Sequence, residues 1–335
     1  MKRLSLLLAL GLIAAACGGD GGSDEAGSSL VVYSGRSEEL VAPLIERFET
    51  ETGIDVDVRY AASGDLATTL IQEGDASPAD VFYAQDPAFI GAVALDGLLT
   101  ALPDDLLSLV PARFSDSEGR WVGVTARSRV MVYNPDLVAA DELPASVWDL
   151  VDPAWQGRLG VAPTNGSFVA FVSAMVLTDG EDRTLEWLEG IAANDPVIFD
   201  GNSPIVAATD AGDVDAGLVN HYYLLRLADE QGGSTARNHY FAGDDPGALV
   251  MPTGAGILSS AANPEQAERF VRFLLSEESQ SYFLDSVFEY PLIEGAGTPD
   301  GQVPLEELGG PDIPLSDLAT VLDTATRLIA EAGLT

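Results

Sequence analysis

The sequence has one cysteine and two histidines in 335 residues. A single cysteine cannot form a disulfide within the chain, and no C-x-x-C or His-x-x-x-His cluster offers the ligands of a structural zinc site. Cationic residues are also scarce, since 16 Lys and Arg stand against 53 Asp and Glu, a net charge of −37. This charge repels phosphate backbones and anionic head groups, which argues against nucleic acid as a partner.

Catalytic signatures are absent as well. There is no G-x-S-x-G elbow, no thiol other than Cys17 and no histidine with an evident acidic neighbour, so a hydrolase lacks its nucleophile and base. The composition is nevertheless that of a folded protein, with 47% apolar and 21% charged residues. The length predicts about two domains, each able to build a core. Binding is therefore favoured over catalysis.

The N-terminus has the pattern of an export signal. Lys2 and Arg3 precede a short uncharged apolar stretch that ends in small residues directly before Cys17. The stretch is shorter than the ~20 residues of a membrane-spanning helix. Small residues before a lone cysteine resemble a bacterial lipobox, so we expect 1–17 to be a lipoprotein signal peptide with lipid attached at Cys17; a plain signal peptide is the alternative. Residues 18–29, rich in Gly, Ser and acids, are typical of a flexible tether.

From residue 30 onward, strand-like and helix-like patterns alternate. The expected order is strand, helix, strand, helix, strand over 30–34, 38–53, 54–60, 65–74 and 79–84. Such alternation predicts an α/β fold, with a mostly parallel sheet flanked by helices and ligands at the carboxyl ends of the strands.

The rest of the chain repeats this style and predicts a second α/β lobe. Strands are expected over 129–134, 158–163, 196–200 and 216–220, with helices over 166–177 and 181–194. The last third predicts a pair of strands around 248–252 and 255–259, followed by helices that end with 317–333.

Six segments in this order carry a family pattern: YSGRSEEL, EGDASPADVFYAQD, ARSRVMVYN, DPAWQGRLGVAPTNGSF, GNSPIVAATDAGDVDAGLVNHYYLLR and DPGALV. Together they closely resemble the ferric-iron-binding proteins of bacterial iron uptake, the bacterial transferrins, over nearly the whole chain after residue 30. The resemblance implies a two-lobed periplasmic-binding-protein type 2 fold whose lobes are joined by crossover hinge strands near 127–130 and 249–252. Lobe 1 would comprise 30–127 plus 252–302, and lobe 2 would comprise 128–251 plus 303–335.

The same resemblance implies a function. The protein would be an extracytoplasmic substrate-binding protein that captures ferric iron, Fe(III), with a synergistic anion such as carbonate, phosphate or citrate in the interlobe cleft. It would deliver this cargo to the permease of an ABC transporter, as a monomer held by its N-terminal lipid on the outer side of the cytoplasmic membrane or in the periplasm. A small organic or oxyanionic solute is the alternative cargo for the same fold.

Tyr222 and Tyr223 are the expected iron ligands. They follow a strand and open a helix, so their hydroxyls would lie at a strand's carboxyl end beside a helix N-terminus, where negative oxygen is favoured. A phenol has a pKa near ~10, but a hard trivalent cation displaces its proton and holds the phenolate. In the family this adjacent pair binds iron. Arg226, four residues after Tyr222, would support the anionic oxygens from the same helical face.

Two positions depart from the family pattern. Where the best-known branch has a histidine and a glutamate as further ligands, this sequence has Ser37 and Gln85. Another tyrosine or an exogenous anion would then complete the site. The candidate tyrosines are Tyr33, at the end of the first strand, and Tyr133, and core packing is the favoured interpretation for both. His221, next to the tyrosine pair, either reaches the cleft or has a structural role, and the second is favoured.

An anion site is also implied by the resemblance. The family's anion pocket matches Arg127, Asn165, Gly166, Ser167, Asn202 and Asn220, with Asp86 where a glutamine is more usual. The chemistry agrees, because backbone N–H groups and a hydroxyl converge on an oxyanion at a helix N-terminus, and arginine adds a fork of donors. Asp86 would repel an anion unless it is paired or turned away.

Overall fold

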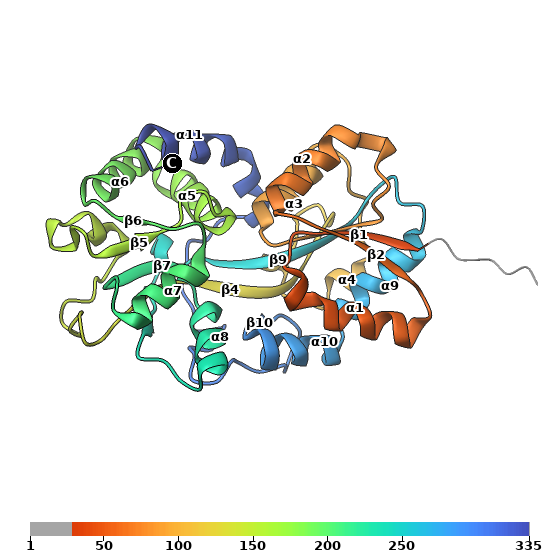
Figure 1. Ribbon diagram of the computed structural model, residues 1–335. Helices are drawn as coiled ribbons and strands as arrows, with labels where there is room; N and C mark the ends of the chain where they lie inside the picture. The colour runs from red at the N-terminus through yellow and green to blue at the C-terminus, as the bar shows by residue number, and fades with distance from the viewer. Residues whose placement is uncertain (1–28, 335) are drawn as a thin grey trace, which may run out of the picture.

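Two long strands, β4 (Val122–Tyr133) and β9 (Val250–Ile257), run between the two halves of the molecule in Figure 1. The computed structural model describes residues 29–334. The expected signal peptide 1–17, the lipidation site Cys17 and nearly all of the tether lie outside the described residues.

The other strands are β1 Leu30–Ser34, β2 Val56–Tyr60, β3 Val81–Ala84, β5 Leu159–Val161, β6 Val197–Ile198, β7 Ala216–Asn220, β8 Arg237–His239 and β10 Tyr290–Pro291. The sheet order is β2-β1-β3-β9-β4-β7-β5-β6, with β8 and β10 also paired to β4. Strands β1, β2 and β3 are parallel, as are β5, β6 and β7, whereas β9 is antiparallel to both β3 and β4. The expected parallel strands are thus present in each half.

Strand β4 changes its partners in the middle. Up to Ser128 it pairs with β9 and β10, and from Arg129 onward it pairs with β7 and β8. In the first register Arg127 lies opposite Met251, and in the second Arg129 lies opposite Asn220. Because alternate side chains point to the same face of a strand, Arg127 and Arg129 are brought to one side of this crossing.

The helices cover both faces of the sheet (Figure 1). They are α1 Glu38–Thr52, α2 Ser63–Glu73, α3 Pro87–Leu95, α4 Asp104–Leu107, α5 Gly166–Asp179, α6 Glu181–Ala193, α7 Asn202–Ala211, α8 Tyr222–Gln231, α9 Pro264–Leu274, α10 Glu277–Tyr282 and α11 Leu322–Glu331. Helix α1 ends as expected at Gly53, which takes the left-handed conformation that glycine allows at a helix C-terminus. Helix α5 is buried from Ser167 to Val176, because α6, α11 and the 3₁₀ helix Leu315–Val321 pack around it.

Two expectations for the C-terminal third are wrong. The segment 248–259 contains one strand, β9 (Val250–Ile257), and not a pair, because Gly254 lets the backbone pass close to Ile90 and Trp121 without a turn. The expected terminal helix is divided into the 3₁₀ helix Leu315–Val321 and α11. The 3₁₀ helix contacts both α3 and α5, so the end of the chain touches both halves.

Gly217 in β7 is a point of close packing. A Cβ at this position would lie 2.2 Å from Cγ2 of Ile205 and 3.1 Å from the carbonyl oxygen of Gly160. Since a packed backbone cannot yield cheaply, we expect Gly217→Ala to lower the free energy of unfolding by ~1–3 kcal/mol in urea denaturation. Gly201→Ala is the matched control, because a Cβ there meets nothing within 4 Å. Equal stability of the two variants would contradict the packing seen at β7.

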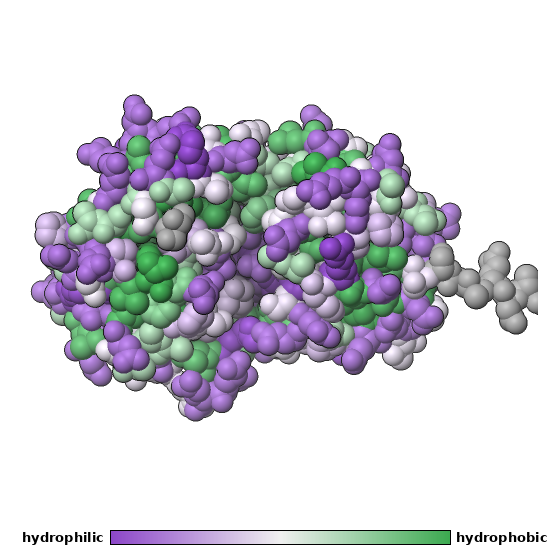
Figure 2. All heavy atoms as spheres, turned by 45° about the horizontal axis from the view of Figure 1, so that its top comes forward, coloured by the Kyte–Doolittle hydropathy of each residue, from purple (hydrophilic) through white to green (hydrophobic). Residues whose placement is uncertain are grey.

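The surface agrees with the acidic composition. On the face shown in Figure 2, hydrophilic residues are spread over both halves. Among residues 29–334, no helix combines the length and the apolar character that crossing a membrane requires.

Candidate functional site

The tyrosine pair lies where β7 ends and α8 begins. Tyr222 is buried, Tyr223 is half-buried, and their rings stack with centroids 4.1 Å apart. Burial raises the pKa of Tyr222 well above the usual value of a phenol, and the neighbouring Tyr223 adds to the rise. The proton of Tyr222 therefore stays in place until a strong electrophile displaces it.

The two phenol side chains line a cavity of about 160 Å³ between the halves, called the tyrosine cavity below. Its wall on the β1–β3 side contains Ser37, Glu39, Leu40 and Gln85, and its wall on the β7 side contains Asn165, Gly201, Asn202, Ser203, Pro204, Tyr222, Tyr223 and Arg226. The fold thus brings together the tyrosine pair with five other residues that the sequence analysis selected: Ser37, Gln85, Asn165, Asn202 and Arg226. Their oxygen atoms and the tyrosines make this a cavity lined by hard donors.

An ion pair spans the tyrosine cavity. Nη2 of Arg226 on α8 lies 3.0 Å from Oε1 of Glu39 on α1. The two residues are 187 positions apart in the sequence and belong to opposite walls. Arg226 also lies 3.6 Å from Glu230 on its own helix. Arg226 thus lies in the same cavity wall as the two tyrosines.

Two fully buried ion pairs lie next to the tyrosines. Nη2 of Arg36 is 2.7 Å from Oε1 of Glu289, whose other oxygen accepts a 2.5 Å hydrogen bond from Oγ1 of Thr125. Nη2 of Arg127 is 3.1 Å from Oδ1 of Asp86. Burial raises the pKa of Asp86 above its usual value, and Arg127 opposes this rise. Asp86 is therefore paired, which is the condition for an anion to approach it.

Arg129 is a third buried arginine, and it differs from the other two. Its Nη1 donates to Oδ1 of Asn220 at 3.2 Å, but no carboxylate of the described residues lies within 4.0 Å of it. Burial lowers the pKa of Arg129 to about 10, with Asp86 and Tyr223 acting in the opposite direction. A buried cation without a counter-ion is costly, so the site as it stands has an excess of positive charge.

Several buried N–H groups around this cluster have no acceptor among the described residues. They are Nε and Nη1 of Arg36, Nη1 of Arg127, Nη2 of Arg129 and Nδ2 of Asn220. Buried donors are normally satisfied, so this concentration beside the two tyrosines points to a missing acceptor of negative charge.

The N-terminus of α5 provides the other half of the predicted anion site. Oδ1 of Asn165 accepts hydrogen bonds from the Ser167 N–H at 3.1 Å and from Ser167 Oγ at 2.6 Å, so Asn165 caps the helix. Nδ2 of Asn202 reaches both Asn165 Oδ1 and Ser167 Oγ at 3.3 Å. A Cβ on Gly166 would lie 3.3 Å from Oδ2 of Asp86, which places this helix end against the Arg127–Asp86 pair. All seven predicted anion residues thus belong to one neighbourhood.

Other expected residues lie elsewhere. The Tyr33 hydroxyl is 3.2 Å from the Glu73 carboxylate and accepts from Arg59 at 3.3 Å, and Tyr33 does not line the tyrosine cavity. Tyr33 is therefore not placed to be a ligand, because its hydroxyl lies among residues of β2 and α2. His221 Nδ1 accepts from the Ser128 N–H at 3.3 Å and Nε2 is 3.0 Å from the Phe288 carbonyl oxygen. Burial lowers the pKa of His221 to about 3, so this histidine is a neutral structural residue.

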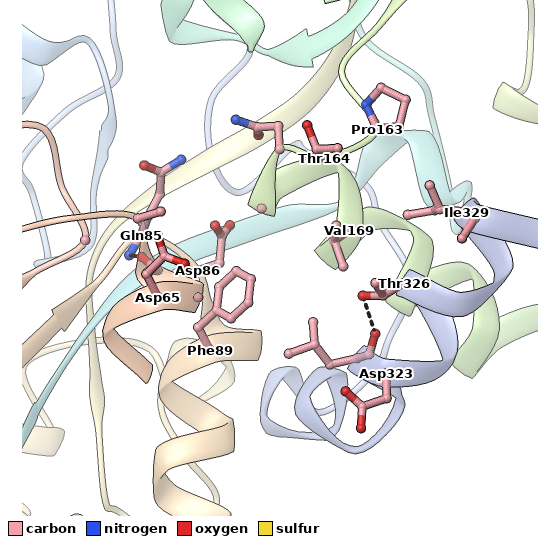
Figure 3. Close-up of a pocket in the computed structure, with 18 residues that line it drawn as sticks. Asp65, Gln85, Asp86, Phe89, Pro163, Thr164, Val169, Asp323, Thr326 and Ile329 are labelled. Carbon is pink, nitrogen blue, oxygen red and sulfur yellow. Dashed lines mark hydrogen bonds between the residues drawn. The ribbon is translucent and has the colours of Figure 1, made fainter. Parts of the chain in front are cut away.

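A larger chamber adjoins the tyrosine cavity. It has a volume of about 480 Å³, shares Gln85 and Asn165 with the smaller cavity, and lies between α2, α3, α5 and α11. Figure 3 shows Phe89 on α3 opposite Val169 on α5, with Ile329 on α11. The cleft therefore has room for more than a single ion beside the tyrosine pair.

Sequence reasoning missed four residues of the site: Arg36, Glu39, Arg129 and Glu289. Arg129 had a signal, because it follows Arg127 by two positions in a strand and so shares its face. The Arg36–Glu289 pair had none, since its members are 253 positions apart. Among residues 29–334, no group of three or more His, Cys, Asp and Glu side chains is arranged to hold a metal ion.

Comparisons with known proteins agree with this geometry. The model of the bacterial extracellular solute-binding protein family matches residues 76–307. The Fe(3+)-binding periplasmic protein of Serratia marcescens is 34% identical over 334 residues, which covers 98% of this chain and 95% of that one. The major ferric iron-binding protein of Neisseria meningitidis serogroup B is 32% identical, over 92% of this chain and 93% of its own length.

Solved structures give the same result for the fold. Iron-bound HitA from Pseudomonas aeruginosa has a TM-score of 0.87 and 37% identity, covering 91% of this chain and 99% of that one. A Trichodesmium protein (IdiA, FutA) in complex with iron and citrate has a TM-score of 0.77 and 25% identity, over 92% and 100% of the two chains. The expected α/β fold of the type 2 periplasmic binding proteins is confirmed. The Serratia and Neisseria relatives are both named as ferric-iron-binding proteins, and the chain belongs to the bacterial extracellular solute-binding proteins.

Proposed function

We propose that this protein captures ferric iron together with a small anion in the tyrosine cavity and delivers it to the permease of an ABC transporter. One observation carries the proposal: two adjacent tyrosines line a cavity of hard oxygen donors beside a buried arginine that has no carboxylate partner. Relatives with printed names that specify ferric iron support the same cargo.

The chemistry of the residues fits a trivalent cation. Tyr222 and Tyr223 would hold the ion as phenolates, because a hard cation displaces the phenol protons. Ser37 and Gln85 contribute only neutral oxygens from the opposite wall. The closed cleft would exclude water, which strengthens these charged contacts.

The anion would complete the ligand set and balance the buried charge. Arg129 supplies the uncompensated cation, while Arg127, Asn220 and the N-terminal N–H groups of α5 supply donors close by. Carbonate, phosphate and citrate all present the oxyanion that these donors require. Citrate accompanies iron in the Trichodesmium relative, and the larger chamber next to Gln85 gives this chain room for an organic anion.

The test is a ferric titration of the metal-free protein, in bicarbonate, phosphate or citrate in turn, followed in the visible spectrum. We expect a tyrosinate-to-iron charge-transfer band whose strength depends on the anion. The Tyr222→Phe, Tyr223→Phe double variant keeps the aromatic rings and their stacking but removes both oxygens, so the band is expected to disappear completely.

Tyr133→Phe serves as the matched control, because Tyr133 lies at the far end of β4 and does not line the tyrosine cavity. Its band is expected to equal that of the unmodified protein. A colourless protein with every anion would reject ferric iron as the cargo and favour the alternative, a small organic or oxyanionic solute bound by the same fold.

The remaining features follow from the class. The family is one of solute-binding proteins that act outside the cytoplasm. We propose that this member is not an enzyme, is a monomer, and is held at the membrane by a lipid on Cys17 after removal of the signal peptide 1–17. The lobes would be 30–127 with 252–302 and 128–251 with 303–335, closing about β4 and β9.

A further inference from the structure

The tyrosine cavity has a single carboxylate in its wall. Among the described residues that line this cavity, Glu39 is the only acid. It lies in the first turn of α1, on the wall opposite the two tyrosines and two positions after Ser37. The wall that contains Ser37 and Gln85 therefore still offers one anionic oxygen donor.

The carboxylate of Glu39 has an ion-pair partner but remains largely exposed. Its partner Arg226 lies on α8 at 3.0 Å, and the Glu39 side chain is 66% exposed. Arg226 has a second acid, Glu230, at 3.6 Å. Release of Glu39 would therefore leave Arg226 paired, so a competing cation in the cavity can take the carboxylate at small cost.

Formal charges also favour a third anionic ligand. The Arg36–Glu289 and Arg127–Asp86 pairs are each neutral. A trivalent ion with the two phenolates of Tyr222 and Tyr223 keeps one positive charge, and Arg129 keeps another. An anion bound as a monoanion, such as bicarbonate, balances only the charge of Arg129. A carboxylate at the ion balances the first, which matters in a closed site of low dielectric.

We propose that Glu39 is the third anionic ligand of the ferric ion and fills the role that the neutral Ser37 and Gln85 cannot. This inference rests on the proposed function. In the unloaded protein Arg226 holds the carboxylate at the edge of the tyrosine cavity, and on loading the carboxylate turns from Arg226 to the metal.

The competing explanation is a latch in which the Glu39–Arg226 ion pair only holds the two walls together. The variants Glu39→Gln and Arg226→Gln separate the two explanations, because each breaks the ion pair but only the first removes a ligand. Glu38→Gln is the control, since Glu38 is exposed, lies in the same turn of α1 and does not line the tyrosine cavity.

Iron affinity would be measured by competition with a chelator that is not among the candidate anions, together with the position of the charge-transfer band. We expect Glu39→Gln to weaken ferric binding by at least about tenfold and to move the band, as loss of a metal ligand does. Glu38→Gln should stay within about twofold of the unmodified protein. Arg226→Gln should keep the band position, because it breaks the ion pair without removing a ligand of the metal.

Equal losses in Glu39→Gln and Arg226→Gln with an unmoved band would establish the latch and overturn the ligand role. An unchanged Glu39→Gln would overturn it as well. Both outcomes require a charge-transfer band in the unmodified protein. If that band is absent, the proposed function itself has failed, before the role of Glu39 is tested. Thermal unfolding without iron confirms that each variant is folded.

Discussion

Acidification is expected to release iron from the loaded protein steeply, with the apparent dissociation constant rising about a hundredfold for each pH unit. The direction of this pH dependence follows from the chemistry of the ligands. Tyr222 and Tyr223 would bind the metal as phenolates, and a phenol with a pKa of about 10 carries its proton at neutral pH. Burial raises the pKa of Tyr222 well above this value. Binding therefore displaces two protons, and each displaced proton contributes about a factor of ten per pH unit.

The measurement is a competition for ferric iron between pH 8 and pH 6, against a chelator whose own pH dependence is determined without protein. A plot of the logarithm of the dissociation constant against pH should have a slope near minus two. Tyr223→Phe keeps one phenol and should give a slope near minus one. A flat plot for the unmodified protein would show that the phenol protons are not displaced and would remove the tyrosines from the ligand set.

At neutral pH, the proposed transport step requires that opening of the cleft be coupled to release of iron. Iron held at neutral pH by two phenolates does not leave by itself, since the protons that would replace it are scarce. Opening of the cleft about β4 and β9 would admit water to Tyr222 and separate the two walls of the tyrosine cavity. The permease would then act by favouring the open form.

The sequence alone was sufficient for the parts of the fold that rest on local patterns. The alternation from residue 30 to residue 84 predicts β1, α1, β2, α2 and β3 close to their observed bounds. It failed at 248–259, because the glycines of that segment resemble a turn, although Gly254 serves close packing inside β9. A glycine chosen for space and a glycine chosen for a turn look the same in a sequence.

The site was predictable only as far as the family motifs reach. Those motifs select Tyr222, Tyr223, Gln85 and Asn165, which the fold brings to one cavity. The motifs carried no information about the charges that surround the tyrosines. Whether a buried arginine is compensated depends on residues such as Glu289, which lies 253 positions from its partner Arg36. Such pairs become visible only when the tertiary structure is known.

Very different effects on stability are expected when methionine, an uncharged side chain, replaces each of two buried arginines. Arg36→Met leaves the Glu289 carboxylate buried with a hydroxyl of Thr125 but no cation, and should lower the free energy of unfolding by ~3–5 kcal/mol. Arg129→Met removes a buried cation that has no carboxylate partner. The metal-free and anion-free protein should then be as stable as the unmodified one to within ~1 kcal/mol, since loss of one hydrogen bond to Asn220 offsets the relief of desolvation.

The effect of added anions on stability tests whether Arg129 binds the anion. Phosphate or citrate added to the unmodified metal-free protein should raise the midpoint of urea denaturation, because a ligand of the native state stabilises it by mass action. In Arg129→Met the midpoint should not move, although the variant itself is folded and stable. A loss of stability as large as that of Arg36→Met would instead mean that the protein already compensates the charge of Arg129. Arg129 would then need no bound anion beside the tyrosines. The charge balance that assigns Glu39 to the metal would also contain one positive charge fewer and would need to be revised.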